Sequence, residues 1–212
     1  MRRFVGFWAL LLLTFAPRAS SQQAARPGMF DYYLFTLSWS PEYCYSNRAS
    51  SECNLGQHYG FVVHGLWPEF QNGGYPEHCS DAPGLMNPTS MLGIMPDIKL
   101  IQHEWSTHGT CTGLNAEDYF GLIRKTHDSI KIPNEFSGPR TQMRLSPMQI
   151  KADFERLNTS LQDADIRIMC SRDYLTSVEI CLTKDLKPMA CPAARTCPAS
   201  MLKVQPVRYL PR

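Results

Sequence analysis

The segment HEWSTHGTC, from His103 to Cys111, holds two histidines, a glutamate and a cysteine within nine positions. It is close to the zinc-protease pattern His-Glu-x-x-His, but one additional residue separates the histidines. In a helix of 3.6 residues per turn, His103 and His108 would point about 140° apart, whereas two zinc ligands need one face. Glu104 and His108 are four apart and would share a face, an arrangement that suits proton transfer. The spacing therefore favours acid–base chemistry over metal binding.

A third candidate histidine lies in the segment FVVHGLWPEF. It places His64 at the end of an apolar strand, where the chain turns through Gly65 and the aromatic Trp67 follows. A histidine at such a strand exit is placed like an active-site group. The alternative, a hydrogen-bonded histidine of the core, fits the sequence equally well. A single His-Glu pair is also common at solvated helix ends, so neither segment decides the function by itself.

The N-terminus carries an export pattern. Two arginines precede an almost wholly apolar run over residues 4–15, and small residues follow it. This order is typical of a secretory signal peptide, and the run is shorter than the roughly 20 residues of a membrane span. A buried N-terminal helix is the alternative. We expect residues 1–21 to be removed, 22–29 to be a flexible lead-in and 30–212 to form the domain of a secreted or periplasmic monomer.

Charge and cysteine content narrow the class of protein. The chain has 21 Lys and Arg against 19 Asp and Glu, and loss of the signal peptide with its three arginines leaves 18 against 19. This near-neutral balance excludes tight nonspecific binding to phosphates, but not an enzyme that makes a few contacts with a nucleic acid. An even number of cysteines behind a signal peptide predicts disulfides, and the chain has no C-x-x-C pair for a zinc ribbon. The eight are Cys44, Cys53, Cys79, Cys111, Cys170, Cys181, Cys191 and Cys197.

Strands and helices are expected without a βαβ alternation. The first strand should cover 30–40, and the second 61–64 should stop at Gly65 and Pro68 before a long loop over 69–96. Helices are expected at 98–108, after an Asn115 cap at 116–131, and after Ser146 at 147–158, with later strands at 165–170, 175–184 and near 203–210. This order predicts a single α+β domain with a largely antiparallel central sheet flanked by helices.

Taken together, the two histidine segments form a pattern specific enough to indicate a protein family. HGLWP, followed some forty residues later by HEWSTHGTC, resembles the two active-site segments of the ribonuclease T2 family of secreted acid endoribonucleases. FDYYLFTLSWSPEYC is similar to that family's first core strand. The resemblance covers most of the chain from Phe30 to Cys197, firmly at the two motifs and loosely in the last third. It implies a disulfide-bonded ribonuclease domain with the bridges Cys44–Cys53, Cys79–Cys111, Cys170–Cys197 and Cys181–Cys191.

The resemblance also implies a reaction. In those enzymes the 2′-hydroxyl of single-stranded RNA attacks the adjacent phosphate. The products are a 2′,3′-cyclic phosphate and a free 5′-hydroxyl, and no metal or cofactor is needed. Such a transesterification needs a base, an acid and positive charge near the phosphorane. By position His108 is the base and His64 the acid, although the sequence does not fix this polarity. His103 would hold the phosphate, and Glu104 would orient His108 and help to polarise the phosphoryl group.

Three further residues match base-binding positions of that family. Trp67 and Tyr75 would stack on bases, and Glu69 stands where an acidic residue can meet a base edge. Stacking tolerates every base, so the expected specificity is broad. Tyr75 and Glu69 could instead be exposed loop residues. Residues outside the motifs are assigned to the core (Trp39 and Trp105) or to the surface (His58, His78 and His127).

One position departs from the family pattern. Thr107 stands where the family usually has a lysine, and its hydroxyl offers the phosphorane a neutral donor in place of a full charge. This difference affects the expected rate more than the reaction class. It also leaves open the alternative that the protein is a ribonuclease-like toxin or binding module with little or no activity. A zinc hydrolase is the third alternative. Asn158 begins an Asn-Thr-Ser sequon that is glycosylated only in a host that glycosylates.

Overall fold

The computed structural model describes residues 26–54, 57–192 and 196–207. Its strands form one sheet in the order β2-β1-β5-β6-β3, with β4 also paired to β5, and only the β5–β6 pairing is parallel. The α+β fold with a largely antiparallel sheet is therefore confirmed. The strands are β1 (Tyr32–Trp39), β2 (Phe61–Glu69), β3 (Met143–Leu145), β4 (Ile166–Ser171), β5 (Tyr174–Leu182) and β6 (Leu202–Val204). The helices are α1 (Ser40–Ser46), α2 (Ile98–Thr107), α3 (Ala116–Ser129) and α4 (Pro147–Leu157), with several short 3-10 turns between them.

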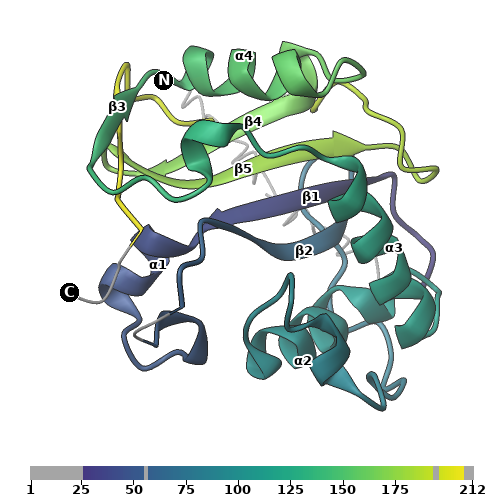
Figure 1. Cartoon of the computed structure of the whole chain (residues 1–212). Coiled ribbons are helices and arrows are strands. Elements are labelled where there is room, and N and C mark those ends of the chain that lie inside the picture. Colours follow the sequence, from purple (N-terminus) through teal and green to yellow (C-terminus); the bar gives the residue numbers. More distant parts are fainter. Residues whose placement is uncertain (1–25, 55–56, 193–195, 208–212) are drawn as a thin grey trace, which may run out of the picture.

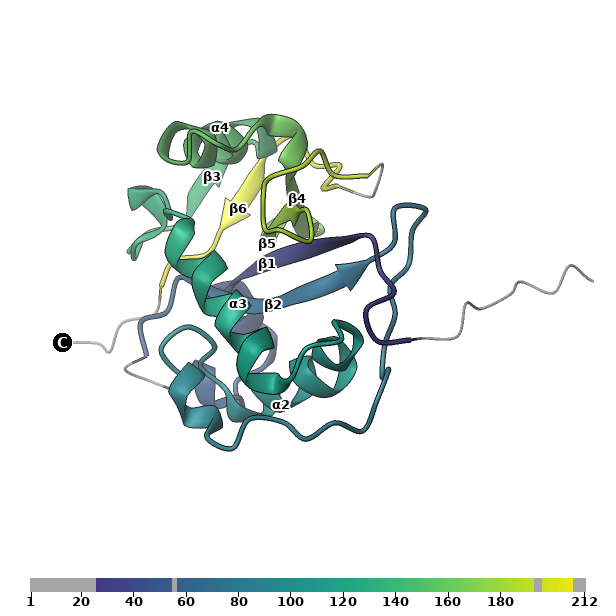
Figure 2. The same ribbon diagram turned by 90° about the vertical axis from the view of Figure 1, so that its right-hand side faces the viewer.

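The helices cover one face of the sheet. In Figure 1, α4 lies over β4 and β5 and α2 lies near β2, and Figure 2 shows α3 running between them. Alternate residues of a strand face opposite sides. Phe35 and Trp39 of β1 therefore join the core beneath the helices, together with Ile123 of α3 and Phe154 of α4. The expected core positions of Trp39 and Trp105 are confirmed, since these residues have exposed fractions of 0% and 4%.

The opposite face of the sheet is only partly apolar. A small cluster formed by Tyr32, Leu34 and Cys181 is packed against Trp67. No helix covers this cluster in the described part of the chain, as expected for one side of an antiparallel sheet. This face also carries the polar side chains of Glu69, Arg167 and Glu179. The apolar core on the other face stabilises the sheet that holds them in place.

The helix starts follow local capping rules. Asn115 accepts a hydrogen bond from the backbone nitrogen of Asp118 at the start of α3. Ser146 and Gln149 form a reciprocal capping box at the start of α4. These bonds satisfy backbone donors that a helix leaves unpaired at its first turn. Both predicted helix starts are therefore confirmed.

Strand β2 is longer than expected. It continues through Gly65 and Pro68 to Glu69, where the sequence predicted a stop after His64. A proline lacks a backbone donor but is tolerated in β2, which lies at the edge of the sheet. A bulge also interrupts the pairing: Leu37 pairs with Val63 and Thr36 with Gly65, so His64 is the extra residue. Bulges bend a strand and re-aim a side chain, and this one falls at the candidate catalytic histidine.

Other boundaries also differ from expectation. The first strand gives way to α1 at Ser40, with Pro41 in its first turn, and the sequence predicted neither this helix nor the short β3. The last strand ends at Val204, and the remainder of its expected span from 208 onward lies outside the described residues.

The four disulfides pair as the family resemblance implied, and all eight cysteines take part. The expected signal peptide, residues 1–21, lies outside the described residues. Within the expected lead-in, the described part is attached to the domain, because the Gly28 backbone nitrogen donates to the Cys111 carbonyl over 2.9 Å. Among the described residues, no helix is long and apolar enough to cross a membrane.

Candidate active site

The bulge in β2 brings His64 to a buried carboxylate on α2. His64 Nε2 lies 3.4 Å from Glu104 Oε1, and its Nδ1 is hydrogen-bonded to the Ser38 hydroxyl over 2.9 Å. Glu104 has no exposed surface, and its Oε2 accepts a hydrogen bond from the Trp67 indole over 2.6 Å. A single carboxylate thus contacts a histidine and a tryptophan that are three positions apart on β2.

Gly65 makes this contact possible. A Cβ atom at this position would collide with the Glu104 carboxylate and with the Trp67 indole. Only glycine lets the backbone of β2 approach α2 so closely. The glycine of the HGLWP segment is therefore part of the site, although it contributes no functional group.

His108 stands just beyond the last turn of α2. It is the C-cap residue, with φ −111° and ψ −44°, and only 8% of its surface is exposed. Its ring centroid lies 5.3 Å from that of Trp67, 5.5 Å from that of Tyr75 and 6.3 Å from that of His103. The rings of His103 and His108 are therefore near neighbours, and the expectation that they point away from each other was wrong.

Glu104 and His108 lie close together without a direct hydrogen bond between their side chains. The two carboxylate oxygens face His64 and Trp67, and within the described structure Glu104 makes no hydrogen bond to His108. His108 Nδ1 is buried without a hydrogen-bond partner. The two residues do lie on the same side of the helix end, as expected, because the His108 backbone nitrogen donates to the Glu104 carbonyl and donor atoms of both side chains lie within 4.8 Å of each other.

Burial controls the protonation of these three groups. It raises the pKa of Glu104 to about 8, against the opposite effect of the Trp67 hydrogen bond. Burial, and to a smaller extent the charge of His103, lowers the pKa of His64 to about 4 and that of His108 to about 4. At mildly acidic pH His64 and His108 are therefore neutral and Glu104 is protonated. A bound phosphate would raise the pKa of both histidines by charge attraction.

A metal-ligand set also exists in this region. Donor atoms of His103, Glu104 and His108 all lie within 4.8 Å of one another. Two imidazoles and a carboxylate are ligands that zinc accepts. The angular argument against a metal at this place is therefore wrong, and the expectation of metal-free chemistry stays a prediction.

Two cavities flank the histidines. The larger, of about 1010 Å³, is bordered by His64 and His103, and its lining includes Tyr43, Arg48, Asp97 and Lys99. The smaller, of about 510 Å³, extends from His108 over the open face of the sheet. All three expected base-binding residues, Trp67, Glu69 and Tyr75, line this smaller cavity.

The expected base-binding residues differ in exposure. Tyr75 is half exposed, with an exposed fraction of 50%, whereas Trp67 and Glu69 are partly buried. Burial raises the pKa of Glu69 to about 7. Arg167 and Glu179 complete the far end of this cavity, and the motifs gave no signal for either. Glu179 lies two strands and Arg167 three strands away from Trp67, so their positions become visible only once the sheet order is known.

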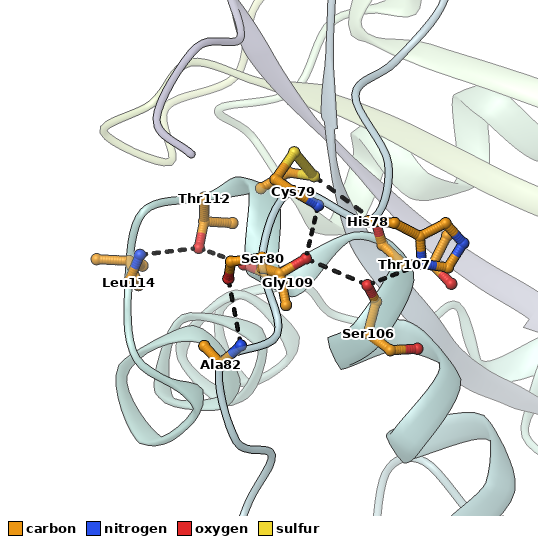
Figure 3. Close-up of a disulfide and its surroundings, with 11 residues drawn as sticks. His78, Cys79, Ser80, Ala82, Ser106, Thr107, Gly109, Thr112 and Leu114 are labelled. Atoms are coloured by element: carbon orange, nitrogen blue, oxygen red, sulfur yellow. Dashed lines mark hydrogen bonds between the residues drawn. A yellow bond between two sulfur atoms is a disulfide. The ribbon is translucent and has the colours of Figure 1, made fainter. Parts of the chain in front are cut away.

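Thr107, which replaces the family lysine, is buried at the end of α2. Its hydroxyl lies 3.3 Å from His103 Nδ1, and its carbonyl accepts a hydrogen bond from the His78 backbone nitrogen over 2.9 Å. The His78 ring also donates through Nδ1 to the Ser106 carbonyl. Figure 3 shows this junction beside the Cys79–Cys111 disulfide. His78 is exposed, as expected, but it lies against the helix end that carries the site.

Residues 30–191 match the model of the Ribonuclease T2 family. The chain belongs to this family. Among relatives of this ribonuclease T2 chain, a ribonuclease of Aeromonas hydrophila is 38% identical over 142 residues, which are 65% of this chain and 63% of that protein. A probable ribonuclease of Haemophilus influenzae is 32% identical over 76% of this chain and 61% of its own length. The chain thus matches less than two thirds of either protein.

Other similarities extend over more of their own chains. Ribonuclease DdI of Dictyostelium discoideum is 28% identical over 91% of this chain and 92% of its own. Among solved structures, RNase NT in complex with 5′-AMP has a TM-score of 0.67 and 24% identity, covering 84% of this chain and 98% of its own. An RNase-related protein from Calystegia sepium has the same TM-score at 22% identity and the same coverage. These structures confirm the ribonuclease T2 fold.

Proposed function

We propose that this protein is a secreted endoribonuclease that cuts single-stranded RNA to 2′,3′-cyclic phosphate ends, with His64 and His108 as an acid–base pair and without a metal or cofactor. The supporting observation is that His64 borders the larger cavity and His108 borders the smaller one. The buried carboxyl group of Glu104 lies beside His64. Cleavage of a bond between two nucleotides needs two proton-transfer groups and room for one nucleotide on each side, and this arrangement offers both.

The base step belongs to His108 in this proposal. Burial lowers its pKa to about 4, so the ring is neutral and can accept the 2′-hydroxyl proton at mildly acidic pH. As this proton leaves, the 2′-oxygen attacks the phosphorus. The nucleotide that supplies the 2′-hydroxyl would place its base in the cavity that His108 borders.

The acid step belongs to His64. It acts as an imidazolium, which the negative charge of the bound phosphate stabilises, and its Nε2 lies 3.4 Å from Glu104 Oε1, which helps to position the ring. As the bond to the 5′-oxygen breaks, that oxygen takes the proton from His64 and leaves as a hydroxyl group. The leaving nucleoside would occupy the larger cavity, which His64 and His103 border.

His103 and Thr107 would bind the phosphate between the two cavities. His103 is exposed and can offer a cationic donor when protonated, and the Thr107 hydroxyl contacts its ring. Trp67 and Tyr75 would stack on the base without selecting it, which supports broad specificity. The similar structure of RNase NT holds 5′-AMP, in agreement with a nucleotide site in this fold.

Thr107 favours a second candidate function. Without the lysine charge, the protein would be a ribonuclease-like toxin or binding module with weak or no activity. The proposed enzyme retains a histidine in each of its two motif segments, together with the buried carboxyl group between them, and this favours catalysis. The four disulfides agree with a secreted or periplasmic location. We expect the mature protein to be a monomer.

Digestion of a defined single-stranded RNA tests this proposal. The products should carry 2′,3′-cyclic phosphate and 5′-hydroxyl ends by mass spectrometry, and the same sequence made of DNA should stay intact because it lacks the 2′-hydroxyl. EDTA should leave the rate unchanged. RNA binding without cleavage would favour the binding module, and loss of activity in EDTA that Zn²⁺ restores would favour the metal site.

A further inference from the structure

The far end of the smaller cavity contains an ion pair that the motifs do not explain. Arg167 of β4 and Glu179 of β5 stand opposite each other in the sheet. The Arg167 Nε and Nη2 atoms both donate to Glu179 Oε2, over 3.0 and 2.6 Å. The Glu179 side chain is buried and that of Arg167 is largely buried, with exposed fractions of 8% and 15%. The pair is therefore held in a fixed geometry.

This pair faces the same side of the sheet as the expected base platform. On β1, Leu34 is paired with Trp67 and with Cys181, and Thr36 is paired with Glu179. Residues two apart on a strand point to one face, so Glu179 and Trp67 lie on the same side. Both line the 510 Å³ cavity that begins at His108, and Arg167 lines it as well.

The charges around this cavity suit a base better than a phosphate. Glu69 also lines it, so one guanidinium accompanies two carboxyl groups, and the cluster has no net positive charge whichever form Glu69 takes. Both bonds from Arg167 end on one oxygen of Glu179. The second oxygen of Glu179 and the remaining nitrogen donors of Arg167 are therefore not used by this pair.

We infer that Arg167 and Glu179 are specificity residues that read the edge of the base in this cavity and favour guanine. Arginine donates to guanine O6 and N7 in the commonest specific contact with a base. Guanine presents two N–H groups on adjacent atoms, N1 and N2, and the Glu179 oxygen that Arg167 leaves unused can accept from both. Uracil has a single N–H on that edge, and adenine and cytosine carry their donors on one amino nitrogen. The inference rests on the proposed function, because it concerns the nucleotide that supplies the 2′-hydroxyl.

A purely structural role for the pair is the alternative. Buried ion pairs contribute little net stability, since apolar residues of similar volume often replace them without loss. A stability role therefore gives no reason for this pair at the end of a cavity that begins at the candidate catalytic histidine. Base selectivity would add to stacking on Trp67, so other bases would be accepted at a lower rate.

Oligonucleotides with one ribonucleotide in a DNA chain test the inference, because cleavage then has a single possible site. Four substrates differ only in that ribonucleotide: guanosine, adenosine, cytidine or uridine. The wild-type protein should cut at guanosine with kcat/KM at least about tenfold above the others, a factor that one good pair of hydrogen bonds to a base can provide. A fifth substrate carries inosine, which lacks the N2 amino group, and should lose much of this advantage.

The variant Arg167→Met/Glu179→Leu removes both charges and leaves no unpaired buried ion. The double substitution should lower the guanosine rate of the variant to its own uridine rate. Glu179→Gln should lower the guanosine rate alone. Lys203→Met is the matched control, because it breaks the 2.8 Å ion pair to Asp173 at a place outside the cavity lining.

The outcomes separate this inference from the proposed function. Failure to cut any of the substrates would contradict the ribonuclease activity itself. Cleavage with equal kcat/KM at all four bases would overturn only the guanine selectivity. The same holds if the preference persists in the double variant, with folding verified by circular dichroism, or if inosine and guanosine are cut equally.

Discussion

The imidazole of His64 lies 3.4 Å from the carboxyl group of Glu104, which has no exposed surface. These residues are forty positions apart and come from an edge strand and a helix. Burial acts on them in opposite directions, since it raises the pKa of Glu104 and lowers that of His64. The proton of the pair is therefore held mainly by the carboxyl group.

The first prediction concerns the stability of Glu104→Gln. Below about pH 4.5 the carboxyl group is neutral in both folded and unfolded states. As pH rises toward 8, the unfolded carboxyl group ionises while the folded one, with a pKa of about 8, stays protonated, so wild-type stability falls. Glutamine avoids this loss and can still accept the Trp67 hydrogen bond.

Thermal unfolding measures this effect. Glu104→Gln should raise Tm over wild type by at least about 4 °C more at pH 8 than at pH 4.5, given about 2–4 °C per kcal/mol for a chain of this size. The exposed Glu117→Gln is the control and should show no such difference. An equal change in Tm at both pH values would contradict the raised pKa.

The second prediction concerns activity against pH. The profile of kcat/KM reports groups of the free enzyme. In wild type the Glu104–His64 pair keeps its proton to high pH, whereas in Glu104→Gln the proton must stay on His64, whose pKa burial lowers. The alkaline limb of kcat/KM should therefore move to lower pH in the variant. A limb at the same pH would show that Glu104 does not hold the proton.

The third prediction concerns Thr107→Lys. A lysine would add the positive charge that the family usually places beside the phosphorane, where one donor typically contributes about 2.7–4 kcal/mol. We expect kcat to rise, most of all toward neutral pH where protonated imidazoles disappear. Thr107→Met is the control for side-chain length, and it should give no rise.

The buried position of Thr107 sharpens this test. Its hydroxyl contacts the His103 ring, so Thr107→Val should also be measured to isolate the loss of that contact. An unchanged or lower kcat at neutral pH in folded Thr107→Lys would mean that another group already supplies the charge.

The fourth prediction concerns the Cys79–Cys111 disulfide, which attaches the loop after β2 to the end of α2 (Figure 3). Replacing both cysteines by alanine should lower the free energy of unfolding by about 2–5 kcal/mol. It should also reduce kcat, because the His108 backbone lies between Thr107 and the bridge. Cys170–Cys197 closes a loop of similar length, 27 residues against 32, and does not line either cavity beside the histidines.

The paired alanine variants therefore form a matched comparison. Both should lose similar stability in urea titrations, but only Cys79→Ala/Cys111→Ala should lose turnover below its unfolding transition. Equal effects on kcat would show that the bridge near α2 has no special role in placing His108.

Part of this arrangement could be predicted from the sequence. Helix starts at Asn115 and Ser146 follow local capping chemistry, so the chain reveals them directly. Alternating apolar residues predicted β5, and the motif resemblance brought His64 and His108 into one site. These features depend on neighbours in sequence or on a pattern with specific spacing.

The remainder depends on tertiary packing. The bulge at His64 arises from pairing with β1, and the contact of Glu104 with His64 and Trp67 depends on how β2 packs against α2. Arg167 and Glu179 join the cavity through the strand order β2-β1-β5, with β4 beside β5. No local pattern encodes these relationships, so the sequence predicted the residues of the site better than their contacts.

The central claim is that His64 is the general acid and His108 the general base. Each alanine variant should lower turnover of the dinucleotide uridylyl-adenosine by at least about 10²-fold. A second substrate, uridine 3′-(4-nitrophenyl phosphate), separates the two roles because nitrophenolate leaves without being protonated.

The most direct measurement is therefore the rate of each variant on the nitrophenyl ester relative to wild type. His64→Ala should cleave this ester at a rate close to wild type, since its leaving group needs no acid. His108→Ala should remain at least about 10²-fold slow, since the 2′-hydroxyl still needs a base. Rescue of His108→Ala but not of His64→Ala would reverse the roles. Near wild-type activity of either variant on the dinucleotide would contradict the account.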